Sequence, residues 1–214
     1  MRERVLLVLL GLGVCFFALT LAERAGADSD LIARFDSTGE GNPAAWYSSL
    51  LLLGCALLAA RAWLPLGLVL ALMAVDELAQ LHERVPGPVM DALEDLSGVS
   101  GTPVRLVAAA ATIAVVVAAL LAARPWYRSL PRPTRRLVAV SAGLFFAGAL
   151  GLELVSRLFD RGHDGLDLWL GPVEELLEMS GAAVFAYALW PSAPAVSFVD
   201  SRVNDTGARP TTCP

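Results

Sequence analysis

Hydrophobic residues occur in six long and nearly uninterrupted runs, separated by short segments that carry most of the charged residues. A membrane-spanning helix needs roughly 20 mostly apolar residues. The pattern therefore predicts an all-α transmembrane helix bundle with six spanning helices, at residues 5–22, 44–60, 62–82, 104–123, 137–157 and 168–190. The connections are short, so any function must reside within the helices or at their ends.

Composition supports a membrane protein over a soluble domain. Of the 214 residues, 56% are hydrophobic, and the mean hydropathy is positive. Residues 1–190 are predicted to form the transmembrane domain, whereas residues 191–214, rich in Pro, Ser and Thr, are expected to be a disordered cytoplasmic tail. The three cysteines form no C-x-x-C pair and give no sign of zinc or redox chemistry.

The distribution of charge predicts an orientation. All 16 basic residues are Arg, and eight of them lie before the first helix, at Arg61 and between residues 124 and 136. The alternate connections 23–43, 83–103 and 158–167 are rich in acids. By the positive-inside rule, both termini are cytoplasmic and these acidic connections face outward. Ala25-Gly26-Ala27 resembles a signal-peptide cleavage site, but the preceding apolar run is long enough to favour a retained helix.

Three predicted helices carry acids at a similar depth in the outer half of the bilayer. At 1.5 Å per residue, Asp76 and Glu77 lie about 9–12 Å below the outer interface, and Glu153 lies about 6–10 Å below it. On the last helix, Glu174, Glu175 and Glu178 lie roughly 10–16 Å down. Buried carboxylates in a membrane usually mark an ion path, a proton relay or a binding site. This acidic layer is the strongest functional signal in the sequence.

Six carboxylates in one layer require protons or cations to offset their repulsion. Arg157, one turn beyond Glu153, and Arg105 are the candidate protein cations, and two arginines do not balance six acids. Small residues at four-residue spacing predict the helix faces that pack together: one stripe holds Gly143, Ala147 and Gly151, and another holds Gly171, Glu174, Glu178 and Gly181. A bound metal or shared protons account for the remaining charge.

Carboxylates with one or two His suit iron, manganese, calcium or magnesium better than zinc or copper. The predicted ligands of a divalent metal are Asp76, Glu77, His82, Glu83, Glu153, Glu174 and Glu178. The predicted supporting residues are Gln80, Arg157, Glu175, Arg105, Trp46 and Tyr47. No Glu-x-x-His pair is present, so a ferritin-like di-iron site is not predicted.

Three classes of function remain open. The first is a metal site near the outer leaflet, in an enzyme that modifies a lipid or transforms a lipid-soluble substrate by redox chemistry. The second is a proton- or cation-coupled transporter, which is less well supported because the acids lie toward one side of the membrane. The third is a structural or sensory membrane protein without catalysis. The net charge of −5 and the lack of a basic patch argue against nucleic-acid binding.

Four segments, NPAAWYSSLLLL (42–53), VDELAQLHE (75–83), GALGLE (148–153) and EELLEMSG (174–181), resemble the signature blocks of a family of uncharacterised bacterial polytopic membrane proteins. The resemblance implies a bacterial cytoplasmic membrane as the location, and it brings no established activity. It also suggests that Asn42, Trp46, Tyr47 and Ser49 belong near the acidic layer. For Trp46 and Tyr47, a place in the interfacial aromatic belt is the simpler interpretation.

Overall fold

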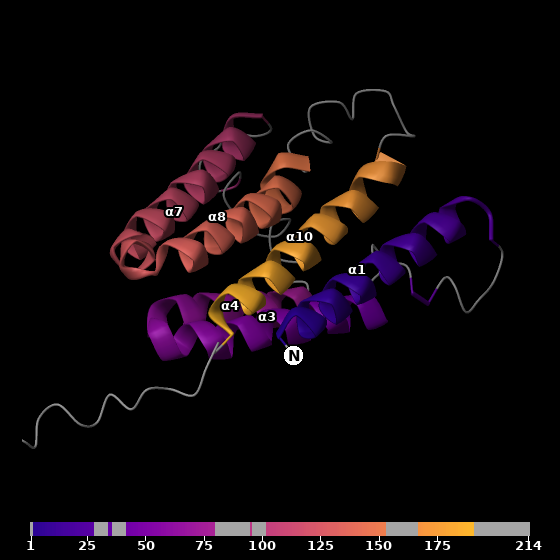
Figure 1. Ribbon diagram of the computed structural model, residues 1–214. Helices are drawn as coiled ribbons and strands as arrows, with labels where there is room; N and C mark the ends of the chain where they lie inside the picture. Colours follow the sequence, from indigo (N-terminus) through magenta and orange to yellow (C-terminus); the bar gives the residue numbers. More distant parts are fainter. Residues whose placement is uncertain are drawn as a thin grey trace, which may run out of the picture.

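The computed structural model describes residues 2–27, 34–35, 42–79, 95, 102–152 and 167–190, and within these ranges it is all helical (Figure 1). The helices are α1 (Arg2–Arg24), α3 (Pro43–Ala62), α4 (Leu64–Ala79), α7 (Thr102–Ser129), α8 (Arg132–Phe146) and α10 (Asp167–Leu189). A π-helix, η1 (Ala147–Leu152), continues α8 without a break. The predicted helical bundle is confirmed.

Helices α3 and α4 form a tight hairpin. Asn42 caps the start of α3, because its side-chain oxygen accepts a hydrogen bond from the Ala45 N–H at 2.9 Å. At the other end, Trp63 is the only residue between the two helices, and its N–H donates to the Ala59 carbonyl. So short a turn brings the helices into contact at once: a Cβ added at Gly67 would lie 2.6 Å from the Ala60 Cβ.

Helix α10 is the centre of the bundle and packs against α1, α3, α8 and η1. Most of its buried positions hold small side chains, at Gly181, Ala182, Ala183, Ala186 and Ala188, and the others hold Pro172 and Met179. Lipid tails are as apolar as a leucine side chain, so helices in a membrane gain little from the hydrophobic effect and rely on close contact instead. Small residues on several faces of α10 allow three other helices to approach its backbone.

Side-chain donors from three helices reach backbone carbonyls of α10. The Ser141 hydroxyl of α8 donates to the Gly181 carbonyl at 2.8 Å, and the Cys55 thiol of α3 donates to the Ala182 carbonyl at 3.2 Å. From α1, the Arg2 guanidinium donates to the Tyr187 carbonyl and lies 4.1 Å from the centre of the Tyr187 ring. In the same way, the Ser49 hydroxyl joins α3 to the Ala74 carbonyl of α4 at 2.7 Å.

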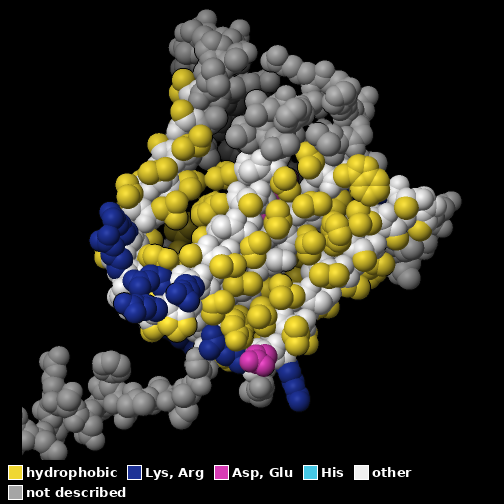
Figure 2. Space-filling view, turned by 45° about the horizontal axis from the view of Figure 1, so that its top comes forward, with side chains coloured by type: hydrophobic (Ala, Val, Ile, Leu, Met, Phe, Trp, Pro, Cys, Tyr) yellow, Lys and Arg dark blue, Asp and Glu magenta, His cyan; other side chains and the backbone are white. Residues whose placement is uncertain are grey.

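Eight arginines of the described helices gather at one end of the bundle, as Figure 2 shows on a surface with large hydrophobic areas. We call this the arginine end, and it is formed by Arg2, Arg4, Arg61, Arg124, Arg128, Arg132, Arg135 and Arg136. The contact of Arg2 with Tyr187 and the stacking of Trp63 on Trp126, at 6.2 Å between ring centres, bring these helix ends together. Away from this end, α7 makes few contacts with the other described helices, and many of its large apolar side chains are exposed.

Three of the described helices are long and apolar enough to cross a membrane: α1, α3 and the continuous α8–η1 helix. Their large apolar side chains are widely exposed: Leu7 is 68% exposed and Leu50 is 61% exposed. Exposed apolar surface over several adjacent helices is characteristic of contact with lipid. The chain therefore has the character of a membrane protein.

The predicted helix boundaries agree to within a few residues for α1, α3 and α10, and two others need correction. Helix α7 continues to Ser129, past the predicted end at 123, and α8 begins at Arg132, before the predicted start at 137. Both predictions followed the apolar run, whereas backbone hydrogen bonding continues through the arginines as far as Pro131. The predicted tail 191–214, residues 80–82 and residues 153–157 lie outside the described residues.

The packing face predicted for the fifth helix is wrong. Gly143, Ala147 and Gly151 are exposed, and no neighbouring atom lies within 4 Å of a Cβ placed on Gly143. The face that meets α10 holds Ser141, Phe145 and Gly148 instead. Four-residue spacing identifies a helix face that can be packed closely, but it does not decide which of two such faces meets the neighbouring helix.

We expect Gly67→Ala to destabilise the α3–α4 hairpin, because the new methyl group would overlap the Ala60 side chain and backbone. Overpacking of this kind costs about 1–3 kcal/mol. Thermal unfolding of the detergent-solubilised protein, followed by circular dichroism, should show a Tm several degrees below the parent. The control is Gly11→Ala on α1, where the added Cβ meets nothing within 4 Å and the Tm should not fall. Equal Tm values for the two variants would contradict the described turn.

Candidate functional site

The acids of α10 lie in its first half, away from the arginine end. Glu174, Glu175 and Glu178 are half-buried, and each takes part in hydrogen bonding or electrostatic interaction. Pro172, two residues before Glu174, is fully buried within the helix. Because proline has no N–H, the Leu168 carbonyl lacks its usual intrahelical donor. The acidic turn of α10 therefore begins beside a main-chain oxygen that is available to another partner.

The π-helix η1 rests directly on the acidic turn of α10. A Cβ placed on Gly148 would lie 2.8 Å from the Glu174 carbonyl oxygen, 3.0 Å from Glu178 Cγ and 3.2 Å from Leu177 Cβ. Only glycine fits at such a distance from a neighbouring backbone. The next residue in the chain after η1 is Glu153, the acid predicted for the fifth helix.

The acids of α4 lie near its end, on the same side of the bundle. Asp76 and Glu77 are half-buried, and each takes part in an interaction. They follow Ala74, which is buried and receives the hydrogen bond from Ser49. Helix α3 thereby holds α4 close to its acidic end. The ends of α4 and η1 and the beginning of α10 thus all point away from the arginine end, as the sequence predicts for an acidic layer.

The described residues contain part of the predicted metal site. Among them, no three side chains of His, Cys, Asp or Glu form a group that could hold a metal ion. The other predicted residues lie outside the described positions; they are Gln80, His82, Glu83, Glu153 and Arg157, together with the side chain of Arg105. The full ligand set therefore stays a prediction.

Trp46 and Tyr47 have different surroundings. Trp46 is 52% exposed, as an interfacial aromatic residue would be. The Tyr47 hydroxyl donates to the Leu9 carbonyl at 2.7 Å, and its ring lies 5.6 Å from that of Phe16. Tyr47 thus joins α3 to α1 and has a packing role that the sequence analysis did not predict.

Sequence reasoning also missed Gly148, although it lies in the GALGLE segment. The signal that could have identified it is the spacing of Ser141, Phe145 and Gly148, at i, i+4 and i+7, which places all three on one helix face. The predicted stripe on α10 is supported at Glu178, whose Cγ lies against Gly148, and at Gly181, which lies against Ser141 and Phe145; at Glu174 it is the backbone carbonyl that lies against Gly148.

A family model described as a domain of unknown function, DUF8692, matches residues 4–191. The chain belongs to the DUF8692 family. The match covers the whole of the predicted six-helix region. Its description as a domain of unknown function confirms the prediction of an uncharacterised family. No curated protein and no solved structure matches the DUF8692 chain.

We expect Gly148→Ala to separate η1 from the acidic turn of α10, because the methyl group would press on the Glu174 carbonyl, a backbone atom that cannot rotate away. The free energy of unfolding should fall by about 1–3 kcal/mol. Gly143→Ala, in the same helix but facing open space, should instead raise it by about 0.5–1 kcal/mol. Chemical unfolding of both variants measures the difference, and a shift of the same sign in both would contradict the close contact.

Proposed function

We propose that this protein is an integral membrane protein of the bacterial cytoplasmic membrane, with six spans and both termini in the cytoplasm. In this proposal, the acids of α4, α10 and the segment after η1 form a divalent-metal site in the outer half of the membrane. Its ligands come from the predicted set, with Asp76, Glu153, Glu174 and Glu178 at its centre.

The observation that carries the proposal is the contact of η1 with α10. Gly148 seats the π-helix on the turn that holds Glu174 and Glu178, and Glu153 follows at the end of that same π-helix. A π-helix widens the turn and is less stable than an α-helix, and such turns are found frequently at functional sites. In this protein, the π-helix η1 supports a site in which Glu153 is brought toward Glu174 and Glu178.

The chemistry of the layer favours a hard divalent cation. Carboxylates are expensive to hold within a membrane unless they are protonated, paired or bound to a cation. Oxygen ligands suit magnesium, calcium, manganese and ferrous iron. A metal held near the outer leaflet would supply Lewis-acid or redox chemistry to a lipid or a lipid-soluble substrate.

Metal content tests the proposal. We expect the protein, purified in detergent without chelator, to contain a stoichiometric amount of one divalent metal. A variant carrying Glu153→Gln, Glu174→Gln and Glu178→Gln should lose it, because the amides keep the volume of the side chains and remove the charge. A control carrying Glu3→Gln, Glu40→Gln and Glu94→Gln removes three acids outside the layer and should retain the metal. Inductively coupled plasma mass spectrometry measures all three proteins.

A parent protein that stays metal-free after incubation with each candidate ion would exclude a metal site. The acids would then be protonated groups, and proton flux in liposomes would become the next measurement. Flux that depends on the same three glutamates without any metal would support a coupled transporter.

Cysteine accessibility tests the orientation. In a variant without Cys15 and Cys213, we expect a membrane-impermeant maleimide to label Ser97→Cys in intact spheroplasts. Ser129→Cys, at the last residue of α7, should react only after permeabilisation. The buried Cys55 can stay as an internal background control. Labelling of Ser129→Cys in intact cells would overturn the proposed orientation.

A further inference from the structure

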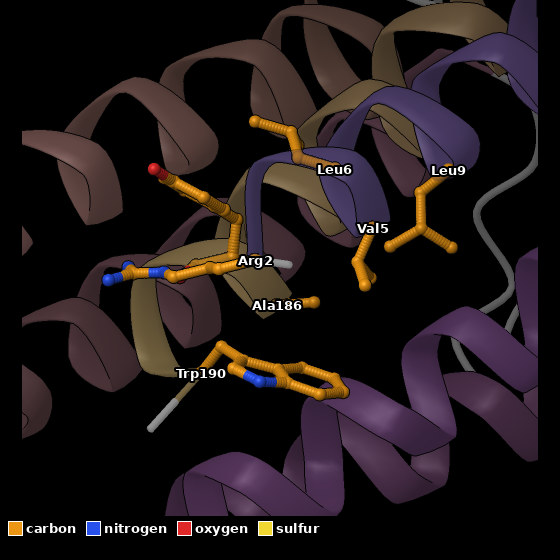
Figure 3. Close-up of a pocket in the computed structure, with 7 residues that line it drawn as sticks. Arg2, Val5, Leu6, Leu9, Ala186 and Trp190 are labelled. Carbon is orange, nitrogen blue, oxygen red and sulfur yellow. The ribbon is translucent and has the colours of Figure 1, made fainter. Parts of the chain in front are cut away.

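A groove runs between α1 and α3 toward the arginine end. Both helices pack against α10 but make little contact with each other, which leaves a cavity of about 650 Å³ between them. Leu9 of α1 and Leu50, Gly54 and Leu57 of α3 are among the apolar residues that line it, and Arg61 and Trp190 lie at its mouth. In Figure 3, Val5 and Leu9 extend from α1 into the space above α3, and Trp190 lies at one end of that space.

The groove is closed at one end and charged at the other. At the closed end, the Tyr47 hydroxyl bonds to the Leu9 carbonyl and holds α1 against α3. At the open end, Arg61 is exposed in the last turn of α3, and no ion pair joins it to another described residue. Arg2 lines the adjoining pocket with Ala186 and Trp190, and its guanidinium donates to the Tyr187 carbonyl.

The dimensions suit one hydrocarbon chain. From Tyr47 to Arg61 the axis of α3 extends about 21 Å, compared with about 15 Å for half of the hydrocarbon core of a bilayer. The groove is therefore long enough to take one acyl chain that enters from a single leaflet.

The charge at the mouth favours an anionic head group. The described part of the arginine end holds eight arginines and a single acid, Glu3. Basic pockets between membrane helices on the cytoplasmic side bind anionic lipid head groups. Trp190, whose indole is 40% exposed, has the amphipathic character that places Trp at the level of head groups.

We propose that this groove binds one anionic phospholipid from the leaflet at the arginine end. One acyl chain lies along Leu50, Gly54 and Leu57, and the phosphate is held by Arg61. The inference rests on the membrane placement in the proposed function. It does not depend on the metal site, which lies toward the opposite end of the bundle.

Native mass spectrometry with added lipid tests the proposal. Delipidated protein is titrated with phosphatidylglycerol and with phosphatidylcholine of the same acyl chains. We expect the first phosphatidylglycerol to bind more tightly, and Arg61→Gln to weaken that binding about fivefold. Arg128→Gln, which removes an arginine of the same end outside the groove, should leave the first binding step unchanged.

A second pair of variants tests the groove itself. Gly54→Leu places a side chain in the cavity, where its Cβ meets nothing within 4 Å, and should abolish the preference for phosphatidylglycerol. Gly143→Leu adds the same bulk to an open position on α8 and should preserve it. Circular dichroism shows whether Gly54→Leu folds. If it does not, Gly54→Val, which adds a smaller side chain, replaces it in the experiment.

Three results would overturn the proposal: equal binding of the two lipids to the parent, full binding by a folded Gly54 variant, or a dimer that Gly54→Leu dissociates. The last would identify a second copy of the chain as the occupant. Metal content is measured in the same samples. A parent protein that binds metal but does not prefer phosphatidylglycerol would contradict the lipid groove alone. A parent protein that prefers phosphatidylglycerol but contains no metal would contradict the metal site alone.

Discussion

The structure depends on how closely other helices can approach the backbone of α10. Three of its carbonyls, at Gly181, Ala182 and Tyr187, accept hydrogen bonds from side chains of α8, α3 and α1. Such contacts require small residues at the interface, and α10 supplies Gly181, Ala182, Ala183 and Ala186 beside the carbonyls that accept these bonds. Each hydrogen bond across membrane helices is worth about 0.6 kcal/mol on average, so the arrangement relies on several acting together with close packing.

This arrangement determines where polar groups can be placed. The half of α10 nearest the arginine end packs against other helices through Ala182, Ala183 and Ala186. This half carries no acidic residue. The other half carries three glutamates and meets the π-helix instead. Helix α10 thus separates a tightly packed region from a polar one along its own length. Within η1, Gly148 approaches the carbonyl of Glu174 to a distance that no larger residue would allow.

The sequence predicted the helices well because each is a long apolar run with arginines or acids at its ends. Asp76, Glu77, Glu174 and Glu178 lie on the halves of α4 and α10 that are remote from the arginine end, and the site predicted to join them with Glu153 stays a prediction. The sequence failed on the face of the fifth helix, where Gly143 and Gly148 each look like a packing glycine and only the neighbouring helix distinguishes them. It also gave no sign of the groove, which results from the divergence of α1 and α3 above the bond between Tyr47 and Leu9. Local patterns report which residues face inward, whereas the spaces between helices depend on how those helices cross.

The central position of α10 also has a consequence for the order of synthesis. Helix α10 follows α1, α3 and α8 in the chain, and its contacts with α1 join residues as far apart as Arg2 and Tyr187. While the earlier helices leave the ribosome, the carbonyls that their side chains will meet have not yet been made. The α3–α4 hairpin can form early because its contacts are local. The contacts of α1, α3 and α8 with α10 can form only when this last of the described helices has been made.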